Sequence, residues 1–79
     1  MIYDYDKLCE KIKEVCGTHQ KFASLMGLSE RSISLKLNNK KYFKQGEIQK
    51  AIVILGIKEY EIHIYFFTPK VQCAWTVIN

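Results

Sequence analysis

The sequence predicts a single all-α domain of five helices. Three observations support this prediction. Apolar residues recur at spacings of three and four, residues that favour helix ends stand between these stretches, and the 79 residues include only one Pro. A chain of this length closes one thin hydrophobic core. We therefore expect one domain over residues 1–67, followed by a tail over residues 68–79.

The first helix is expected from about Asp6 to Cys16. Its apolar positions form one stripe, consisting of Tyr5, Leu8, Cys9, Ile12, Val15 and Cys16. Asp4 or Asp6 can cap its start, and Gly17 can end it. Because Cys9 and Cys16 belong to this stripe, we interpret both as packing residues.

Two short helices follow, joined by a turn of three residues. Thr18 is the expected N-cap of the second helix, and Gly27 is suited to the left-handed conformation that follows a helix. Ser29 is the expected N-cap of the third helix, which Asn38 and Asn39 can end. The second helix has its apolar positions at Phe22, Ala23, Leu25 and Met26, and the third helix is expected to bury Ile33 and Leu37. Leu28 and Ile33 are expected to fill the angle between the two helices.

The last part of the chain begins with a loop, Lys40-Lys41-Tyr42-Phe43, in which we expect both aromatic residues to act as anchors. A fourth helix follows and stops at Gly56; its apolar positions are Ile48, Ala51, Ile52 and Leu55. Residues 57–67 fit both the helical and the strand period, and we favour a short helix ended by Pro69. Apolar residues alternate from Val71 to Val77, which predicts a short C-terminal strand or a disordered tail.

The positive charge of the protein is concentrated in its middle third. The net charge is +4 overall. Residues 18–44 hold six Lys or Arg against Glu30 alone, an excess of five positive charges, whereas the segments on either side are slightly acidic or neutral. Such a segment is either a solvated surface or the electrostatic footprint of a nucleic-acid-binding surface.

Several classes of function find no support in the sequence. His19 and His63 are isolated from each other and from paired acids, so we expect no metal site, no cofactor and no enzyme activity. The three cysteines suggest neither a disulfide framework nor a zinc knuckle. No apolar run is long enough to cross a membrane, and the N-terminus does not resemble a signal peptide. A cytoplasmic location is therefore expected.

The segment from Thr18 to Asn38 resembles the helix-turn-helix of the Cro/repressor-type regulators of phages and prophages. The resemblance rests on Phe22-Ala23, on Gly27-Leu28-Ser29, on Ile33 and on Lys36-Leu37-Asn38. It implies a five-helix, lambda-repressor-like domain over about residues 5–67. His19 stands where the family often has Gln, and Lys36 occupies a position that is usually apolar.

In this family the third helix enters the major groove of DNA, where each base pair presents a distinct pattern of donors and acceptors. Arg31 is the preferred residue for a bidentate contact to guanine, Glu30 for a cytosine amine, and Leu35 for a thymine methyl group. For Glu30 the alternative is a solvated residue, and for Leu35 a minor core contact. The full set of expected base contacts is Ser29, Glu30, Arg31, Ser32, Ser34 and Leu35.

Phosphate contacts are expected around the rim of this surface. The unpaired N–H groups at the start of the second helix suit an anion. Lysines and asparagines near the end of the third helix can hold the other strand, unless they are simply solvated. The expected phosphate contacts are His19, Gln20, Lys21, Lys36, Asn38, Asn39, Lys40, Lys41 and Lys44.

The preferred hypothesis is a transcriptional regulator, Cro-like or repressor-like, that binds operator DNA as a homodimer and has no small-molecule substrate. One short recognition helix reads few base pairs, and a dimer on two half-sites reads about twice as many. The tail over residues 71–79 is either the dimer element or a segment folded onto its own domain. Two alternatives remain: a protein-interaction module that kept the fold without the affinity for DNA, and an antitoxin-like protein whose tail docks on a toxin.

Overall fold

The computed structural model describes residues 2–70 of the chain. Within these residues the fold is entirely helical, which confirms the predicted class. Its elements are α1 (Asp6–Cys16), α2 (His19–Met26), α3 (Glu30–Leu37), α4 (Gln45–Leu55), the 3-10 helix η1 (Glu59–Glu61) and α5 (Ile62–Phe66). The ambiguous stretch after Gly56 is therefore helical, as favoured from the sequence. The predicted strand over residues 71–77 lies outside the described residues.

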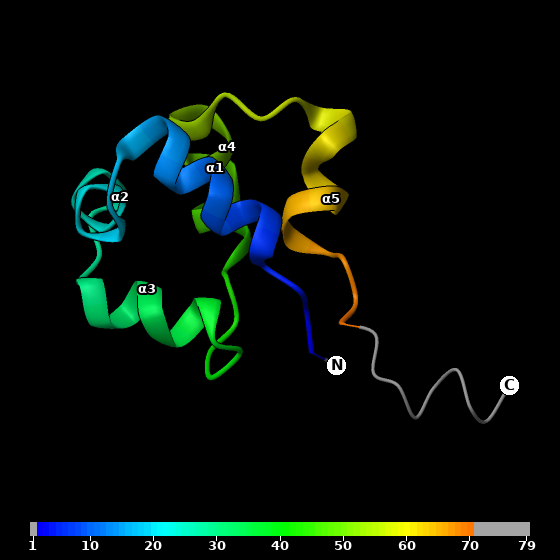
Figure 1. Ribbon diagram of the computed structural model, residues 1–79, viewed down its shortest axis with the longest axis horizontal. Helices are drawn as coiled ribbons and strands as arrows, with labels where there is room; N and C mark the ends of the chain where they lie inside the picture. Colours follow the sequence, from blue (N-terminus) through cyan, green and yellow to red (C-terminus); the bar gives the residue numbers. More distant parts are fainter. Residues whose placement is uncertain (1, 71–79) are drawn as a thin grey trace, which may run out of the picture.

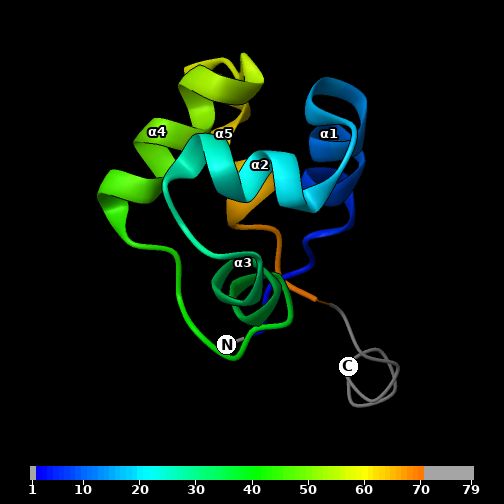
Figure 2. The ribbon, with the colours of Figure 1, turned by 90° about the vertical axis from the view of Figure 1, so that its left-hand side faces the viewer.

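One hydrophobic core holds the helices together. Its fully buried side chains come from all five α-helices and include Leu8, Phe22, Ile33, Ala51 and Phe66. Helix α2 contacts α1, α3 and α4, whereas α1 contacts α2, α4 and α5. Helix α3 lies at one end of the molecule, below α2, and is seen nearly along its axis in Figure 2 (Figures 1 and 2). This position leaves one side of α3 away from the core.

The turn between α2 and α3 has the predicted helix-end chemistry. The Thr18 hydroxyl accepts a hydrogen bond from the Lys21 N–H (3.0 Å), and the Ser29 hydroxyl accepts one from the Ser32 N–H (3.1 Å). Gly27 has a φ of +73°, a conformation that costs glycine little because it lacks a Cβ. From α4, the Lys50 ammonium donates to the Met26 carbonyl at the end of α2 (3.2 Å). These contacts thus fix both ends of α2 and the start of α3.

Aromatic rings from α5, from the loop before α4 and from the residue before α1 pack against one another. Phe43 lies between Tyr5 and Phe66, with ring centroids 5.5 and 5.4 Å apart in edge-to-face geometry, so it is the anchor that the sequence predicted. Tyr42 is different, because 76% of its surface is exposed. The expectation that Tyr42 also anchors the loop was wrong. Since successive residues of an extended loop point in opposite directions, only one of the two rings reaches the core.

The two ends of the described chain lie side by side. Tyr3 and Pro69 form an antiparallel bridge, supported by hydrogen bonds from Asp4 N–H to Thr68 O (2.7 Å) and from Lys70 N–H to Ile2 O (2.9 Å). The side-chain amide of Asn39 completes this junction: it accepts from the Tyr3 N–H and donates to the Tyr3 carbonyl, both at 2.9 Å. Residues 68–70 are therefore attached to the helical domain, and the boundary at residue 68 remains a prediction.

Three local expectations differ from the structure. Tyr5 occupies the N-cap position of α1 without a side-chain cap bond, while the Asp4 carboxylate accepts from the Asp6 N–H (2.9 Å). Val15 and Leu25, counted as core from their spacing, are 47% and 45% exposed. Both lie at the margin of an apolar stripe. Such margins reach solvent when no neighbouring helix covers them.

Candidate functional site

The two faces of α3 have different surroundings. On the inner face Ile33 is fully buried and Leu37 packs against the core. On the outer face Glu30, Arg31 and Ser34 are exposed. An α-helix has 3.6 residues per turn, so each turn of α3 places some side chains against the core and others in solvent. The outer face of α3 is the candidate functional surface.

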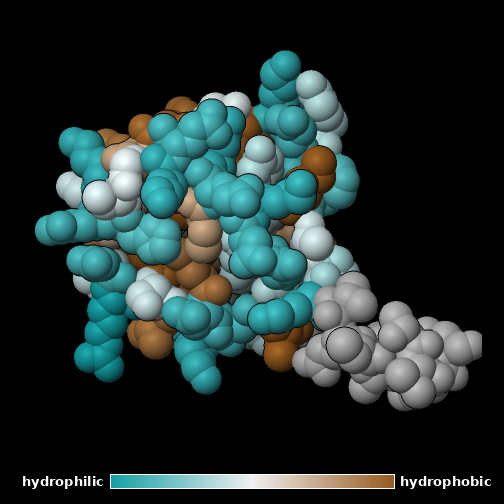
Figure 3. All heavy atoms as spheres, viewed as in Figure 1, coloured by the Kyte–Doolittle hydropathy of each residue, from teal (hydrophilic) through white to brown (hydrophobic). Residues whose placement is uncertain are grey.

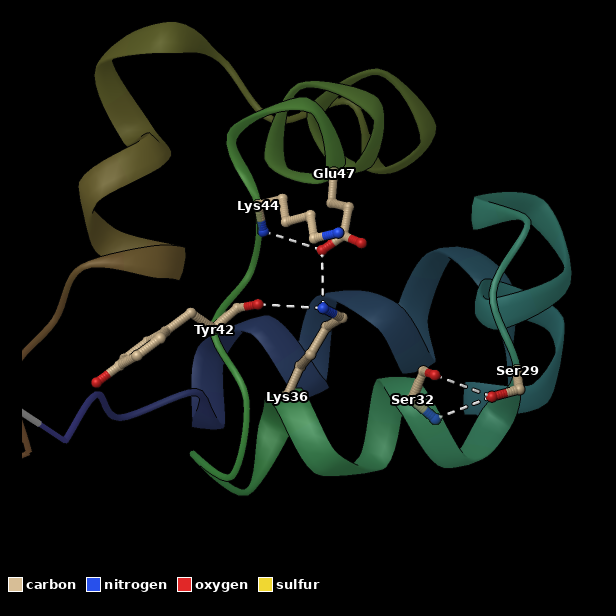
Figure 4. A network of polar contacts seen from close by, with 6 residues as sticks. All are labelled: Ser29, Ser32, Lys36, Tyr42, Lys44 and Glu47. Atoms are coloured by element: carbon tan, nitrogen blue, oxygen red, sulfur yellow. Dashed lines mark hydrogen bonds and ion pairs between the residues drawn. The ribbon is translucent and has the colours of Figure 1, made fainter.

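The start of α3 carries most of the expected base contacts. Ser29 is committed to capping, since its hydroxyl accepts from the Ser32 N–H and also donates to the Ser32 hydroxyl (3.0 Å, Figure 4). Glu30 and Arg31 follow in the first turn, and both side chains are exposed. Leu35 is half-buried, so part of its side chain reaches solvent. The structure thus brings all six residues of the set to one helix, with Arg31 as its longest outward cation.

The start of α2 contributes the second part of the surface. His19, Gln20 and Lys21 are all exposed. Thr18 takes up the Lys21 N–H, whereas the first N–H groups of a helix have no partner within it. Lys21 lies in the first turn of α2, so its charge adds to the positive end of the helix dipole. This arrangement favours an anion.

The segment after α3 contributes the third part. Lys40, Lys41 and Lys44 are exposed. Asn38 is exposed as well, and its amide donates to the Ser34 carbonyl (2.8 Å), which fixes it to the last turn of α3. Asn39 has a φ of +62° and uses its amide on Tyr3. Asn39 is therefore a link between the end of α3 and the N-terminal segment, and the structure does not offer its amide as a phosphate ligand.

Lys36 is the largest departure from the predicted surface. Its residue is 5% exposed, and its ammonium forms an ion pair with Glu47 Oε1 at 2.9 Å and donates to the Tyr42 carbonyl at 3.1 Å (Figure 4). The same ammonium lies 5.9 Å from the centre of the Phe43 ring. Lys36 thus joins α3 to the loop and to α4. The structure removes it from the expected phosphate contacts.

Glu47, the partner of Lys36, is a residue near this surface that was not predicted from the sequence. Burial alone would raise the pKa of its carboxyl group, but the Lys44 N–H at 2.9 Å and the Lys36 ammonium outweigh burial, so the pKa lies below its ordinary value. The carboxylate also caps the start of α4, because it accepts from the N-cap residue Lys44. Its spacing of three residues after Lys44 is the signal by which sequence reasoning could have found it.

Two surface hollows flank α3. One, of about 480 Å³, lies between the N-terminal segment, α1 and the end of α3, and is lined by Tyr5, Cys9, His19 and Leu37 among others. The other, of about 520 Å³, lies between α3 and the start of α4, with Lys36 and Glu47 among its lining residues. Hydrophilic side chains cover most of the face in Figure 3, and apolar residues show between them.

Other groups take little part in this surface. Burial raises the pKa of the Cys9 thiol, as do the carboxylates of Asp6 and Asp4, and burial raises that of Cys16. Both thiols thus remain protonated at neutral pH. Among residues 2–70 no group of three or more His, Cys, Asp or Glu is placed to hold a metal ion. None of the helices in this part of the chain is long and apolar enough to span a membrane.

Comparisons with known proteins identify the family. Residues 1–69 match the model of a family described as protein of unknown function, DUF739. The solution structure of the modulator of repression (MOR) of the temperate bacteriophage TP901-1 from Lactococcus lactis is similar: it is 51% identical, with a TM-score of 0.75 over 91% of this chain and 97% of that chain. No curated protein sequence matches. The chain therefore belongs to the DUF739 family, and its similarity to MOR places it among phage regulatory proteins.

Proposed function

We propose that this protein regulates phage gene expression by binding double-stranded operator DNA through the outer face of α3. The observation that carries the proposal is the arrangement around this helix. Its inner face is buried, its outer face is open, and exposed cations stand at both of its sides. An α-helix of this kind fits the major groove of B-DNA. The proposal also agrees with the sequence resemblance to Cro/repressor-type regulators.

Base contacts would come from the first turns of α3. The exposed Arg31 guanidinium has the planar, two-pronged geometry that matches the acceptors of guanine. Glu30, one residue earlier, can accept from a cytosine amine, and the exposed part of Leu35 can touch a thymine methyl group. The serines add short hydroxyls that either donate or accept. Specificity would therefore rest mainly on Arg31.

Phosphate contacts would come from the rim. Lys36–Glu47 is the only ion pair within residues 2–70, so the ammonium groups of Lys21, Lys40 and Lys41 have no carboxylate partner there, and that of Lys44 acts on Glu47 only from beyond ion-pair distance. Lys21 stands at the start of α2, and the other three follow α3. Such cations position a protein on the duplex without reading its sequence. They also make the affinity depend on salt.

A homodimer would complete the operator complex. One short α3 reads few base pairs, whereas two copies related by a two-fold axis read a palindromic site with half-sites about one helical turn apart. The tail assigned to dimer contact from the sequence lies outside the described residues.

Selection from a library of phage-promoter DNA at two salt concentrations tests the proposal. Wild type should select a palindromic site. Arg31→Ala should relax the choice of sequence, whereas Lys40→Ala/Lys41→Ala should weaken binding to all sequences and flatten the salt dependence. The matched control is Lys58→Ala, an exposed lysine next to η1 that should change neither property. If wild type shows no salt-dependent binding to DNA, the proposal fails.

A second candidate is a module that binds another phage regulatory protein. Two observations favour it. Ser29, Ser32 and Ser34 are short side chains that reach less far into a groove than Gln, Asn or Arg, and Lys36 is withdrawn into the interior. In addition, the similar phage protein is named a modulator of repression, a role that either DNA or a repressor could mediate. Titration with the purified repressor of the same phage, with and without operator DNA, distinguishes the two candidates.

A further inference from the structure

A buried ion pair connects α3 to the start of α4. The Lys36 ammonium and the Glu47 carboxylate are 2.9 Å apart, and their side chains are 6% and 18% exposed. The Glu47 oxygen that binds Lys36 also accepts from the Lys44 N–H, while Lys36 donates to the Tyr42 carbonyl (Figure 4). Among residues 2–70, Lys36 is the one charged residue that is buried. Contact with water therefore does not account for the position of its charge.

The surroundings of this pair are open on one side. Lys36 and Glu47 line the hollow of about 520 Å³ between α3 and α4, and Lys41, Lys44 and Ser32 line it with them. Lys41 and Lys44 are exposed and form no ion pair within residues 2–70, although the Lys44 charge also helps to lower the pKa of Glu47. The Lys36 side chain is long and flexible, so its ammonium can reach solvent through the hollow while its stem stays packed.

An ion pair is not the only kind of contact that could join the two helices at this point. Glutamine at position 47 would retain a side-chain oxygen to accept from the Lys44 N–H, and apolar residues at both positions could pack equally well. The carboxylate has one effect that neither substitute shares. It compensates the positive charge of Lys36 inside the protein, where an unpaired ammonium would be unfavourable.

We infer that Glu47 withholds Lys36 from the anions that this surface binds, and so limits its affinity for them. Under the proposed function, on which this inference rests in part, these anions are DNA phosphates. Glu47 is then a positioning residue that acts through Lys36. Loss of its charge would release the ammonium toward the hollow, beside Lys41 and Lys44, and add one phosphate contact.

DNA binding as a function of salt measures the added contact. Compared with wild type, Glu47→Gln should steepen the plot of log K against log salt by about 0.9, which corresponds to about a 3.5-fold change over a fourfold range of salt. Lys36→Met/Glu47→Gln should return the slope to the wild-type value. Glu59→Gln, which removes an exposed carboxylate on η1, controls for the change in net charge and should leave the slope unchanged. Equal slopes for Glu47→Gln and wild type would overturn the inference.

Amine labelling tests the withholding without DNA. With a water-soluble acylating reagent and mass spectrometry, Lys36 of wild type should react far more slowly than Lys40 of the same molecule, and Glu47→Gln should bring the two rates together. Equal rates in wild type, or an unchanged Lys36 in the variant, overturn the inference. If labelling behaves as expected but no variant binds DNA, the proposed function fails and the withholding of Lys36 stands.

If Glu47→Gln does not fold, Lys36→Met in the wild-type background decides the question. A withheld lysine makes no phosphate contact, so its loss should leave the salt slope of DNA binding unchanged. A slope shallower by about 0.9 would show that Lys36 already contacts phosphate in wild type, which contradicts the inference.

Discussion

Lys36 and Lys40 belong to the same basic segment but to different environments. Lys36 lies one helical turn after Ile33 and points inward, where Glu47 and the Tyr42 carbonyl hold its ammonium. Lys40 follows the end of α3 and is exposed. The same contrast separates the inner face of α3 from its outer face. Charge counted along the sequence therefore overstates the charge of the surface, because backbone geometry decides which side chains reach solvent.

The comparison predicts that substitutions on the inner face of α3 cost stability, whereas those on its outer face change binding. The largest effect is expected for Ile33→Ala. Ile33 is fully buried, so its truncation removes apolar contacts and leaves a cavity, and the free energy of unfolding should fall by about 3 kcal/mol. Urea denaturation measures this loss. Ser34→Ala, the exposed neighbour, should stay within about 0.5 kcal/mol of wild type; equal losses would break the distinction between the faces.

The second prediction compares the two lysines directly. Lys36→Ala leaves the partly buried Glu47 carboxylate without its ion pair, and the free energy of unfolding should fall by about 1–3 kcal/mol. Lys40→Ala should change it by no more than about 0.5 kcal/mol, because this side chain is exposed. Thermal and urea unfolding of both variants provide the measurement. Similar stability of the two variants would mean that Lys36 is not held in the interior.

The third prediction concerns the start of α3. Ser29→Ala removes the hydroxyl that accepts from the Ser32 N–H, so the free energy of unfolding should fall by about 1 kcal/mol. Asp at position 29 should restore stability, since its carboxylate accepts the same bond and interacts favourably with the helix dipole. If Ser29→Asp has no higher free energy of unfolding than Ser29→Ala in urea denaturation, residue 29 does not cap α3.

The smallest effect is the pH dependence of the Glu47 contribution. The pKa of Glu47 is lower in the folded protein than in the unfolded chain, so its stabilisation is complete above the unfolded value of about 4.3 and is lost as the pH falls through the folded value. The difference in unfolding free energy between wild type and Glu47→Gln should therefore shrink from pH 7 to pH 3. A difference independent of pH would contradict the lowered pKa.

The sequence was sufficient where a local interaction determines the structure. Thr18, Ser29 and Gly27 act at helix ends through neighbours within three residues, and each has its predicted role. The bounds of α1 and the helical state of the stretch after Gly56 followed from apolar spacing in the same way.

The sequence was insufficient where the position of a side chain depends on a partner far away along the chain. Asn39 contacts Tyr3, 36 residues away, and Lys36 requires Glu47 on another helix. No local pattern reveals such a partner. One indication was present: Lys36 occupies a position that is usually apolar in Cro/repressor-type regulators, as expected for an inward-facing side chain. The exposed residues of α2 and α3 in the candidate surface were therefore predictable from the sequence. The neutralisation of the Lys36 charge by Glu47 was not predictable.

Amide chemical shifts of the ¹⁵N-labelled protein, recorded during titration with a duplex selected from phage-promoter DNA, test the central claim most directly. If the outer face of α3 binds DNA, shifts should concentrate in residues 19–21, 29–35 and 40–44, and they should diminish as salt is added. Shifts that are absent at low salt, or that concentrate on α1 and α5, would contradict a DNA-binding role for α3.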